Sequence, residues 1–156
     1  MEAKSCDSNG ECVLCDKPRC PVEKDKENYI LYRGEHCYIM LNLYPYTNGH
    51  MMIVPYLHEG DLTELDDDSL QGMSVLMRAA VAALSRLMQP TGFNIGMNLG
   101  RVAGAGIAEH LHMHVVPRWQ GDTNFMSVLG DTRMIPEDLD ITYDKLRPLL
   151  AEEVSK

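Results

Sequence analysis

The chain has 156 residues, a formal net charge of −9 and 45% hydrophobic residues. This length and apolar content suit one domain whose core needs no disulfide framework. The acidic balance excludes general affinity for nucleic acid, which requires arrays of Lys and Arg. No apolar run approaches the roughly 18 residues of a membrane span, and the polar N-terminal stretch is unlike a signal peptide, so we expect a cytoplasmic location and no membrane partner.

Residues 1–28 mix Cys, Lys, Glu, Asp and Pro with neither a helical nor a strand period. This pattern predicts an irregular N-terminal segment, followed by a folded domain over residues 29–156. The five cysteines are odd in number and crowded toward this end. That distribution suits metal ligation or free thiols in a reducing compartment better than disulfides.

Cys12 and Cys15 have the two-residue spacing that lets both thiolates reach one tetrahedral zinc ion. A closed structural site needs two further ligands, so the pair is half a site. A bound zinc would anchor the N-terminal segment. Two unligated thiols are one alternative, and ligation by Cys20 or Cys6 is another.

Alternating and β-prone residues predict an antiparallel meander after residue 28. Its strands are expected over residues 29–32, 36–43 and 49–55, with a hairpin turn at 33–35 and a longer connection at 44–48.

The clearest helix signal follows this meander. Asp66, Asp67 and Asp68 precede apolar residues that recur at three-and-four spacing from residue 70 to Met88, until Pro90 ends the run. Acidic residues at a helix N-terminus agree with the helix dipole. The methionine-rich stripe of this helix is interpreted as core.

Two more strands are predicted over residues 93–99 and 110–117, separated by a Gly-rich link at 100–106. Loop-like residues follow, including Gly130, Asp131 and Pro136, and a final helix is expected within residues 141–154.

Three histidines alternate with apolar residues in the sequence His110-Leu-His112-Met-His114. On a strand these side chains project from one face, while Leu111 and Met113 point to the other. Imidazoles crowded in this way repel one another when protonated, so they indicate chemistry or metal binding. A neutral imidazole is a competent nucleophile near pH 7, and the phosphoramidate it forms divides one hard displacement into two easier ones.

The run from His110 to Val116 resembles the motif that names the histidine triad (HIT) family, and residues 42–55 resemble its upstream signature. The order of the two motifs is right, and the resemblance covers roughly residues 29–120. Residues 42–56, together with the extension from His110 to Phe125, look closest to the bacterial diadenosine tetraphosphate phosphorylase-like branch.

The resemblance implies an α+β HIT fold, with an antiparallel sheet of about five strands, one main helix and a dimer across a two-fold axis. It implies that His112 attacks the α-phosphorus of a nucleotide and forms a nucleotidyl-histidine, which phosphate or water then resolves. It also implies substrate contacts around this nucleophile. These contacts are His114 at the phosphates, Asn42 at the ribose, Asn98 near the scissile phosphate, and Trp119. Independently of the resemblance, the backbone amides of Gly104, Ala105 and Gly106 could meet the negative charge of a phosphate.

Some relatives bind zinc through such a cysteine pair and two histidines, which here are His50 and His110. The expected site is therefore Cys12, Cys15, His50 and His110, with zinc in a structural role. For Trp119 the alternative is an aromatic residue that completes the core. Arg101 and Arg118 could steer phosphates or could be solvated surface residues.

Other functions stay open. Within the family the alternative is a hydrolase of dinucleoside polyphosphates or nucleoside phosphoramidates, and Gly106 lacks the hydroxyl that many relatives carry there. Uridylyltransfer to a sugar phosphate is disfavoured because Leu111 replaces an expected proline. Outside the family, the three histidines could ligate a catalytic metal in a hydrolase, or the chain could bind nucleotides without turnover.

Overall fold

The structure, a computed structural model, describes residues 12–122 and 137–156. The alternative ligand Cys6, residues 123–125 of the family-like extension and the predicted loop residues Gly130, Asp131 and Pro136 lie outside these ranges. The strands are β1 (Ile30–Arg33), β2 (Cys37–Leu41), β3 (Met51–Pro55), β4 (Gly92–Met97) and β5 (Met113–Arg118). The helices are α1 (Val13–Arg19), α2 (Asp25–Asn28), α3 (Asp67–Met88) and α5 (Leu139–Val154), with 3₁₀ turns at Val22–Lys24 and Arg101–Ala103.

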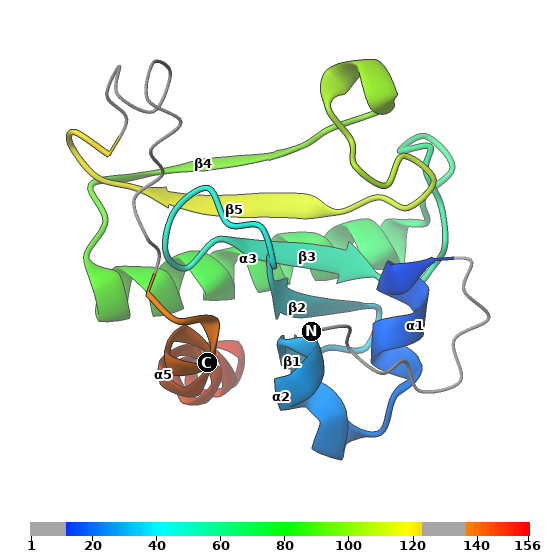
Figure 1. The fold of residues 1–156 in the computed structure, drawn as a ribbon. Coiled ribbons are helices and arrows are strands. Elements are labelled where there is room, and N and C mark those ends of the chain that lie inside the picture. Colours follow the sequence, from blue (N-terminus) through cyan, green and yellow to red (C-terminus); the bar gives the residue numbers. More distant parts are fainter. Residues whose placement is uncertain (1–11, 123–136) are drawn as a thin grey trace.

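The five strands form one antiparallel sheet in the order β1-β2-β3-β5-β4 (Figure 1). The expected α+β architecture with a five-stranded sheet is therefore confirmed. Cross-strand register places Met40 opposite Met52, and Met52 opposite His114. His114 consequently projects from the same face of the sheet as Met52.

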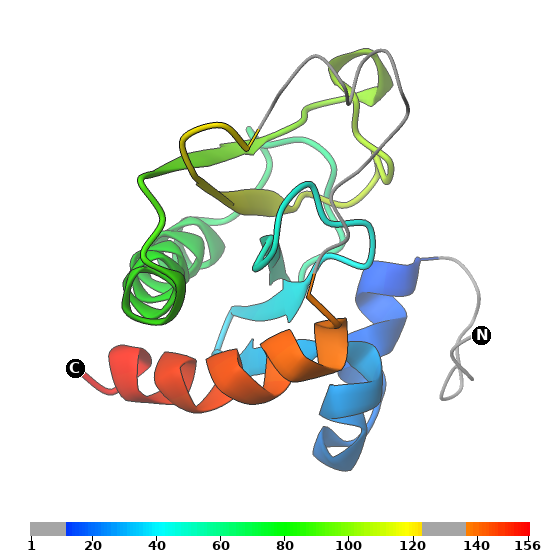
Figure 2. The same ribbon diagram turned by 60° about the vertical axis from the view of Figure 1, so that its left-hand side comes forward.

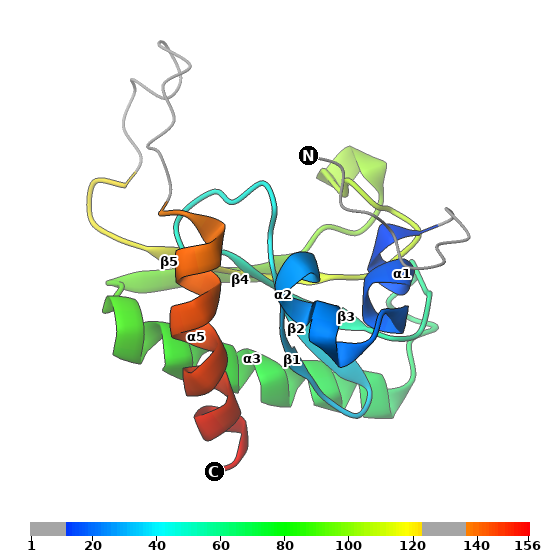
Figure 3. The same ribbon diagram turned by 60° about the horizontal axis from the view of Figure 1, so that its bottom comes forward.

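The main helix, α3, covers the other face of the sheet. Its N-cap Asp66 accepts a hydrogen bond from the Ser69 amide, and it ends at Gln89 in the left-handed conformation, just before Pro90. Its buried side chains join residues of β2, β3 and β5 in the larger core, which α5 completes by packing against α3 and β1 (Figure 3). None of the helices in the described ranges is both long and apolar enough to span a membrane.

The N-terminal stretch differs from the expected irregular segment, because most of residues 12–28 are helical. A second, smaller core explains this. Leu14 of α1 is buried against Tyr38, Met40 and Val54, and the Tyr38 hydroxyl donates to the Leu14 carbonyl at 2.7 Å. Figure 2 shows α1 and α3 on opposite sides of the strands.

Arg33 fastens this N-terminal layer to the sheet. Its guanidinium contacts the Asp25 carboxylate at 2.7 Å and donates to the carbonyls of Pro18 and Cys20. Tertiary contacts of this kind stabilise short helices whose sequence shows no period of its own.

The histidine strand is shorter than predicted. β5 begins at Met113, so His110 and His112 precede the strand and only His114 of the three lies on it. The physical reason is a different backbone partner: the Leu111 amide donates to the Glu59 carbonyl at 2.7 Å, whereas pairing with β3 reaches only from Met113 to Val115. Leu111 still joins the core beneath α3. His110 contacts Cys12 of the smaller core, which lies on the same face of the sheet as Met52 and His114.

Candidate active site and metal centre

His112 is 7% exposed, and its Nδ1 lies 2.8 Å from the carbonyl oxygen of His110. A carbonyl can only accept a hydrogen bond, so this contact places the ring proton on Nδ1. Nε2 then carries the lone pair. An imidazole held in this way can act as a nucleophile without a carboxylate partner.

The His114 ring lies 5.0 Å from the His112 ring, between centroids, and Nδ1 of His114 lies 2.9 Å from Nε2 of His50. A backbone amide sets the direction of the hydrogen bond between His50 and His114. The Tyr46 amide donates to Nδ1 of His50 at 3.1 Å, so Nε2 of His50 is protonated and donates to Nδ1 of His114. Nε2–H of His114 remains as a donor for an anion.

Burial lowers the pKa of His50 to about 4, and the neighbouring His114 and His112 act in the same direction. The pKa of His114 is also lowered, first by burial and then by His112. Both rings are therefore neutral at pH 7. A neutral His114 that is held as a donor can contact a phosphate without an added desolvated charge.

The loop between β2 and β3 brings Asn42 next to His50. Its Oδ1 accepts from the Tyr44 amide at 2.9 Å, and its Nδ2 lies 3.4 Å from the His50 ring. Gly96 of β4 is opposite His114 in the sheet, and a side chain added there would meet nothing within 4 Å. This leaves open space beside His114 on the site face.

The Gly-rich link forms the turn that follows β4. Asn98 donates from Nδ2 to the Gly104 carbonyl at 3.3 Å, and Gly104 has a φ of +94°, a conformation that favours glycine. Arg101 pairs with Glu109 at 2.9 Å across this turn. Ala105 is buried and Gly106 is exposed. The side chain of Asn98 is therefore hydrogen-bonded to the Gly-rich turn.

Trp119 is not brought to the histidines. Its indole N–H donates to the Met88 carbonyl at 3.3 Å, at the end of α3, and β5 separates it from His112 by roughly 20 Å of extended chain. Within one chain Trp119 therefore lies apart from His112, and its predicted contact with the substrate stays a prediction. Arg118 is engaged as well, because its guanidinium contacts both carboxylate oxygens of Asp122.

A second cluster joins the N-terminal helix to the histidine segment. Sγ of Cys12 and Sγ of Cys15 lie 3.3 and 3.4 Å from Nδ1 of His110, and Sγ of Cys15 lies 3.2 Å from Nδ1 of His58. The four ligand atoms all lie within 4.8 Å of one another. Tetrahedral zinc with Zn–S of about 2.3 Å and Zn–N of about 2.0 Å separates its ligand atoms by roughly 3.3 to 3.8 Å. The cluster has the donor types and spacing for that ion.

The fourth side chain of this cluster is His58, and the predicted ligand His50 is wrong on this geometry. His50 is occupied by Tyr46 and His114, whereas the loop after β3 carries His58 to Cys15. Taken alone in the sequence, His58 has no pattern that marks it as a ligand. Its position three residues after Pro55, whose carbonyl faces His110, is the one available signal.

His110 contacts both the cysteine cluster and His112. Its Nε2 lies 2.9 Å from the Pro55 carbonyl oxygen, which fixes the proton on Nε2 and turns the Nδ1 lone pair toward the thiols. Its own carbonyl meanwhile holds Nδ1 of His112. The three histidines therefore do not converge on one ion, which disfavours a catalytic metal held by all three.

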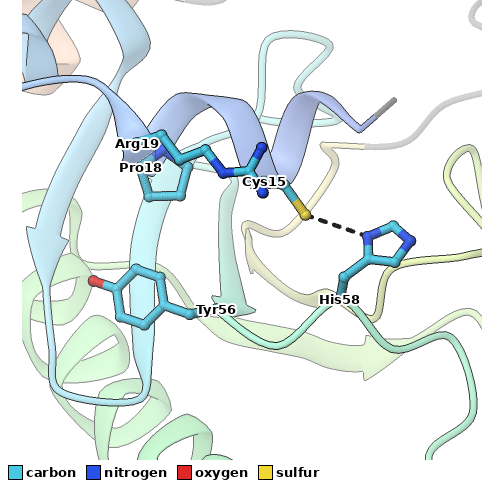
Figure 4. A pocket seen from close by; sticks show the side chains of 5 residues that line it. All are labelled: Cys15, Pro18, Arg19, Tyr56 and His58. Atoms are coloured by element: carbon cyan, nitrogen blue, oxygen red, sulfur yellow. Dashed lines mark hydrogen bonds between the residues drawn. The ribbon is translucent and has the colours of Figure 1, made fainter. Parts of the chain in front are cut away.

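The outer side of the Cys12, Cys15, His58 and His110 cluster is open. Cys15 and His58 face each other at the edge of a cavity of about 270 Å³, which Pro18, Arg19 and Tyr56 complete (Figure 4). Burial, and then the neighbouring Cys12, raise the pKa of the Cys15 thiol to about 11. An ion bound here would displace that proton and take the thiolate.

Comparisons with known proteins agree with this arrangement. The family model for the HIT domain matches residues 23–121. An AP-4-A phosphorylase of Mycobacterium tuberculosis (strain CDC 1551 / Oshkosh) is 43% identical over 85% of this chain, and the match spans 66% of that protein's length, just under two thirds. An uncharacterized HIT-like protein of Methanocaldococcus jannaschii is 36% identical over 76% of this chain and 88% of its own.

A solved structure extends the likeness to three dimensions. The crystal structure of a Zn-bound histidine triad family protein from Mycobacterium smegmatis superposes with a TM-score of 0.71 at 29% identity, covering 91% of this chain and 94% of that one.

Proposed function

Since this chain belongs to the histidine triad (HIT) family, we propose that it cleaves dinucleoside polyphosphates, with diadenosine tetraphosphate as the expected substrate, by transferring a nucleotide to His112. The similarity to an AP-4-A phosphorylase supports the substrate class. One observation carries the mechanism: the His110 carbonyl holds the proton of His112 on Nδ1 and leaves Nε2 free to attack.

In the first step Nε2 of His112 forms a bond to the α-phosphorus, and the bond from that phosphorus to the bridging oxygen breaks. ATP leaves, and the adenylyl group stays on His112. In the second step an acceptor attacks the same phosphorus and the P–N bond breaks. Inorganic phosphate as acceptor gives ADP, whereas water gives AMP.

Around this centre we assign His114 to the phosphates, because its Nε2–H is held as a donor by His50. Asn42 is assigned to the ribose, and Asn98 with the turn at Gly104, Ala105 and Gly106 to the leaving phosphates, where backbone amides can meet negative charge. No substrate contact within one chain is assigned to Trp119, because its indole donates to the Met88 carbonyl.

The acceptor is expected to be phosphate. A phosphorylase must hold the anion in line with the nucleotidyl-histidine and leave little room for water. Chromatography of products from diadenosine tetraphosphate should therefore give ADP and ATP, at a rate that rises with added phosphate. AMP and ATP formed equally fast with and without phosphate would identify a hydrolase and reject phosphorolysis, while the role of His112 would stand.

We further propose zinc as the resident ion of Cys12, Cys15, His58 and His110. The Zn-bound Mycobacterium smegmatis protein and the ligand spacing support this choice. A bound ion would cross-link α1, the loop after β3 and the segment before β5. Its role is structural, because four protein ligands leave no position for substrate. Persistence of these thiols requires a reducing compartment, so we propose a cytoplasmic location.

We also propose that two copies associate through β4. This strand forms one edge of the sheet and has no buried residue, and Ile95 on it is 41% exposed. A long exposed edge strand with apolar side chains favours pairing with a second chain. The other edge, β1, packs against α2 and α5.

A charge on the β4 edge should separate the copies. Ile95→Lys is expected to convert a dimer into a monomer in analytical ultracentrifugation, because the ammonium group would be desolvated at the new interface. Val75→Lys, on an equally exposed position of α3, serves as the control and should remain dimeric. A wild-type monomer, or an Ile95→Lys dimer as stable as the wild type, would refute this interface.

A further inference from the structure

The four side chains of the Cys12, Cys15, His58 and His110 cluster differ in their exposure. Cys12 is 8% exposed and His110 is fully buried, whereas Cys15 is partly exposed and His58 is exposed. The cluster therefore has a closed side and an open side. A molecule that arrives from solvent reaches the sulfur of Cys15 before it reaches that of Cys12.

The open side leads into the cavity of about 270 Å³ beside Cys15 (Figure 4). Its volume is close to the lower limit of about 300 Å³ for a small-molecule pocket. Pro18 and Tyr56 give the wall apolar surface, and Arg19, whose side chain is 59% exposed, adds a positive charge. The same guanidinium contacts Asp16 at 3.4 Å. This wall suits a small organic molecule that carries a carboxylate.

The two sulfur atoms of the cluster are close enough to react with each other. Those of Cys12 and Cys15 lie 3.3 and 3.4 Å from Nδ1 of His110, and all four ligand atoms are within 4.8 Å of one another. Two cysteines with two residues between them can close a disulfide. An accessible thiolate beside a second thiol is the arrangement found in cysteines that oxidise reversibly.

We infer that Cys12 and Cys15 form a thiol–disulfide switch, in which Cys15 reacts first and Cys12 completes the disulfide. The inference rests on the proposed zinc site, because it gives two of the ligands of that site a second, reversible state. The co-reactant is a small organic disulfide that carries carboxylates, as the cavity beside Cys15 favours.

Two exchange reactions convert the thiolates into the disulfide. Sγ of Cys15 attacks one sulfur of the small disulfide, the S–S bond breaks and one thiolate leaves. Sγ of Cys12 then attacks the sulfur of Cys15, and the second thiolate leaves. The two cysteines lose two electrons, the small disulfide gains them, and solvent protonates the two leaving thiolates. His58 and His110 are then two ligands where a closed site needs four, so the site loses its ion.

The test starts from zinc-loaded protein, whose metal content is measured before any oxidant is added. The protein is equilibrated without air in glutathione buffers of increasing oxidised fraction. A chromogenic chelator measures released zinc, and fragmentation mass spectrometry locates the disulfides. We expect about one equivalent of zinc to appear in step with a disulfide between Cys12 and Cys15. Dithiothreitol with added zinc should reverse both changes, and protein in reduced glutathione should keep its zinc.

Single variants test the order of the two exchanges. Cys12→Ser should accumulate a mixed disulfide with glutathione at Cys15, because no second thiol is present to displace it. Cys15→Ser should leave Cys12 unmodified over the same time, because Cys12 is buried. Cys20→Ser removes a buried thiol outside the cluster and should respond as the wild type does.

Zinc and free thiols that persist in fully oxidised glutathione would overturn the inference, and so would a disulfide to any other cysteine. Equal modification of Cys12→Ser and Cys15→Ser would overturn the assigned order. Failure of the zinc site appears earlier, as protein without metal before the oxidant is added. In that case the disulfide between Cys12 and Cys15 alone decides the switch. Transfer of a nucleotide to His112 is measured separately.

Discussion

Replacement of His112 by alanine is expected to lower kcat by at least about 10⁴-fold, because no other group in the described site can form the covalent intermediate. The fold should persist. The side chain is buried, but the one hydrogen bond that the structure gives it runs to the His110 carbonyl. Its loss costs about 1 to 3 kcal/mol, which lowers the melting temperature by several degrees at most. Steady-state kinetics and calorimetry measure both quantities.

Two controls make this result specific to the nucleophile. His112→Gly with added free imidazole should regain part of the rate, since the small molecule can occupy the vacated space. His36→Ala removes a surface imidazole, 40% exposed in its side chain, and should leave kcat unchanged. A His112→Ala protein with more than about a hundredth of the wild-type rate would exclude covalent catalysis by this residue.

Loss of the metal centre is expected to give the largest change in stability. Purified protein should carry about one equivalent of zinc, and Cys12→Ser should lose most of it, together with roughly 10 °C of melting temperature. The physical reason is that Cys12 is at the start of α1 and its partner His110 is about a hundred residues away in the chain. The ion would thus close a long loop.

The chain offers matched controls for the metal site. Cys20→Ser alters another buried thiol, whose Sγ lies near the Asp16 carbonyl outside the cluster, and should retain zinc. His58→Ala should lose zinc, whereas His50→Ala should keep it. The opposite order for the two histidines would restore His50 as the ligand, and metal-free wild-type protein of unchanged stability would refute the site.

Local patterns in the sequence predicted most of the fold. The apolar period after Asp66 predicted α3, and alternation predicted all five strands, because these elements bury one face against one core. Helix α1 was missed since it depends on tertiary contacts. The side chain of Leu14 in this helix is buried, and the Leu14 carbonyl accepts a hydrogen bond from Tyr38 on β2.

In the site, too, local patterns were predictable from the sequence and tertiary contacts were not. The spacing of the triad identified His112 and His114 as neighbours, and the structure places their rings together. Spacing alone could not reveal that His110 precedes the strand, because the Glu59 and Pro55 carbonyls that bind this segment lie some fifty residues earlier in the chain. The sequence did not predict His58 as a ligand because its contact with Cys15 also joins residues that are far apart in the chain.

Covalent attachment of a nucleotide to His112 is the step on which the proposed function depends. The most direct test mixes the protein with diadenosine tetraphosphate in phosphate-free buffer, quenches at alkaline pH to protect the P–N bond, and measures the intact mass and the peptide that carries the adduct. We expect one adenylyl group on the peptide containing His112, and none on the His112→Asn protein. An unmodified chain that still releases ATP at the full rate, or an adduct on another residue, would contradict it.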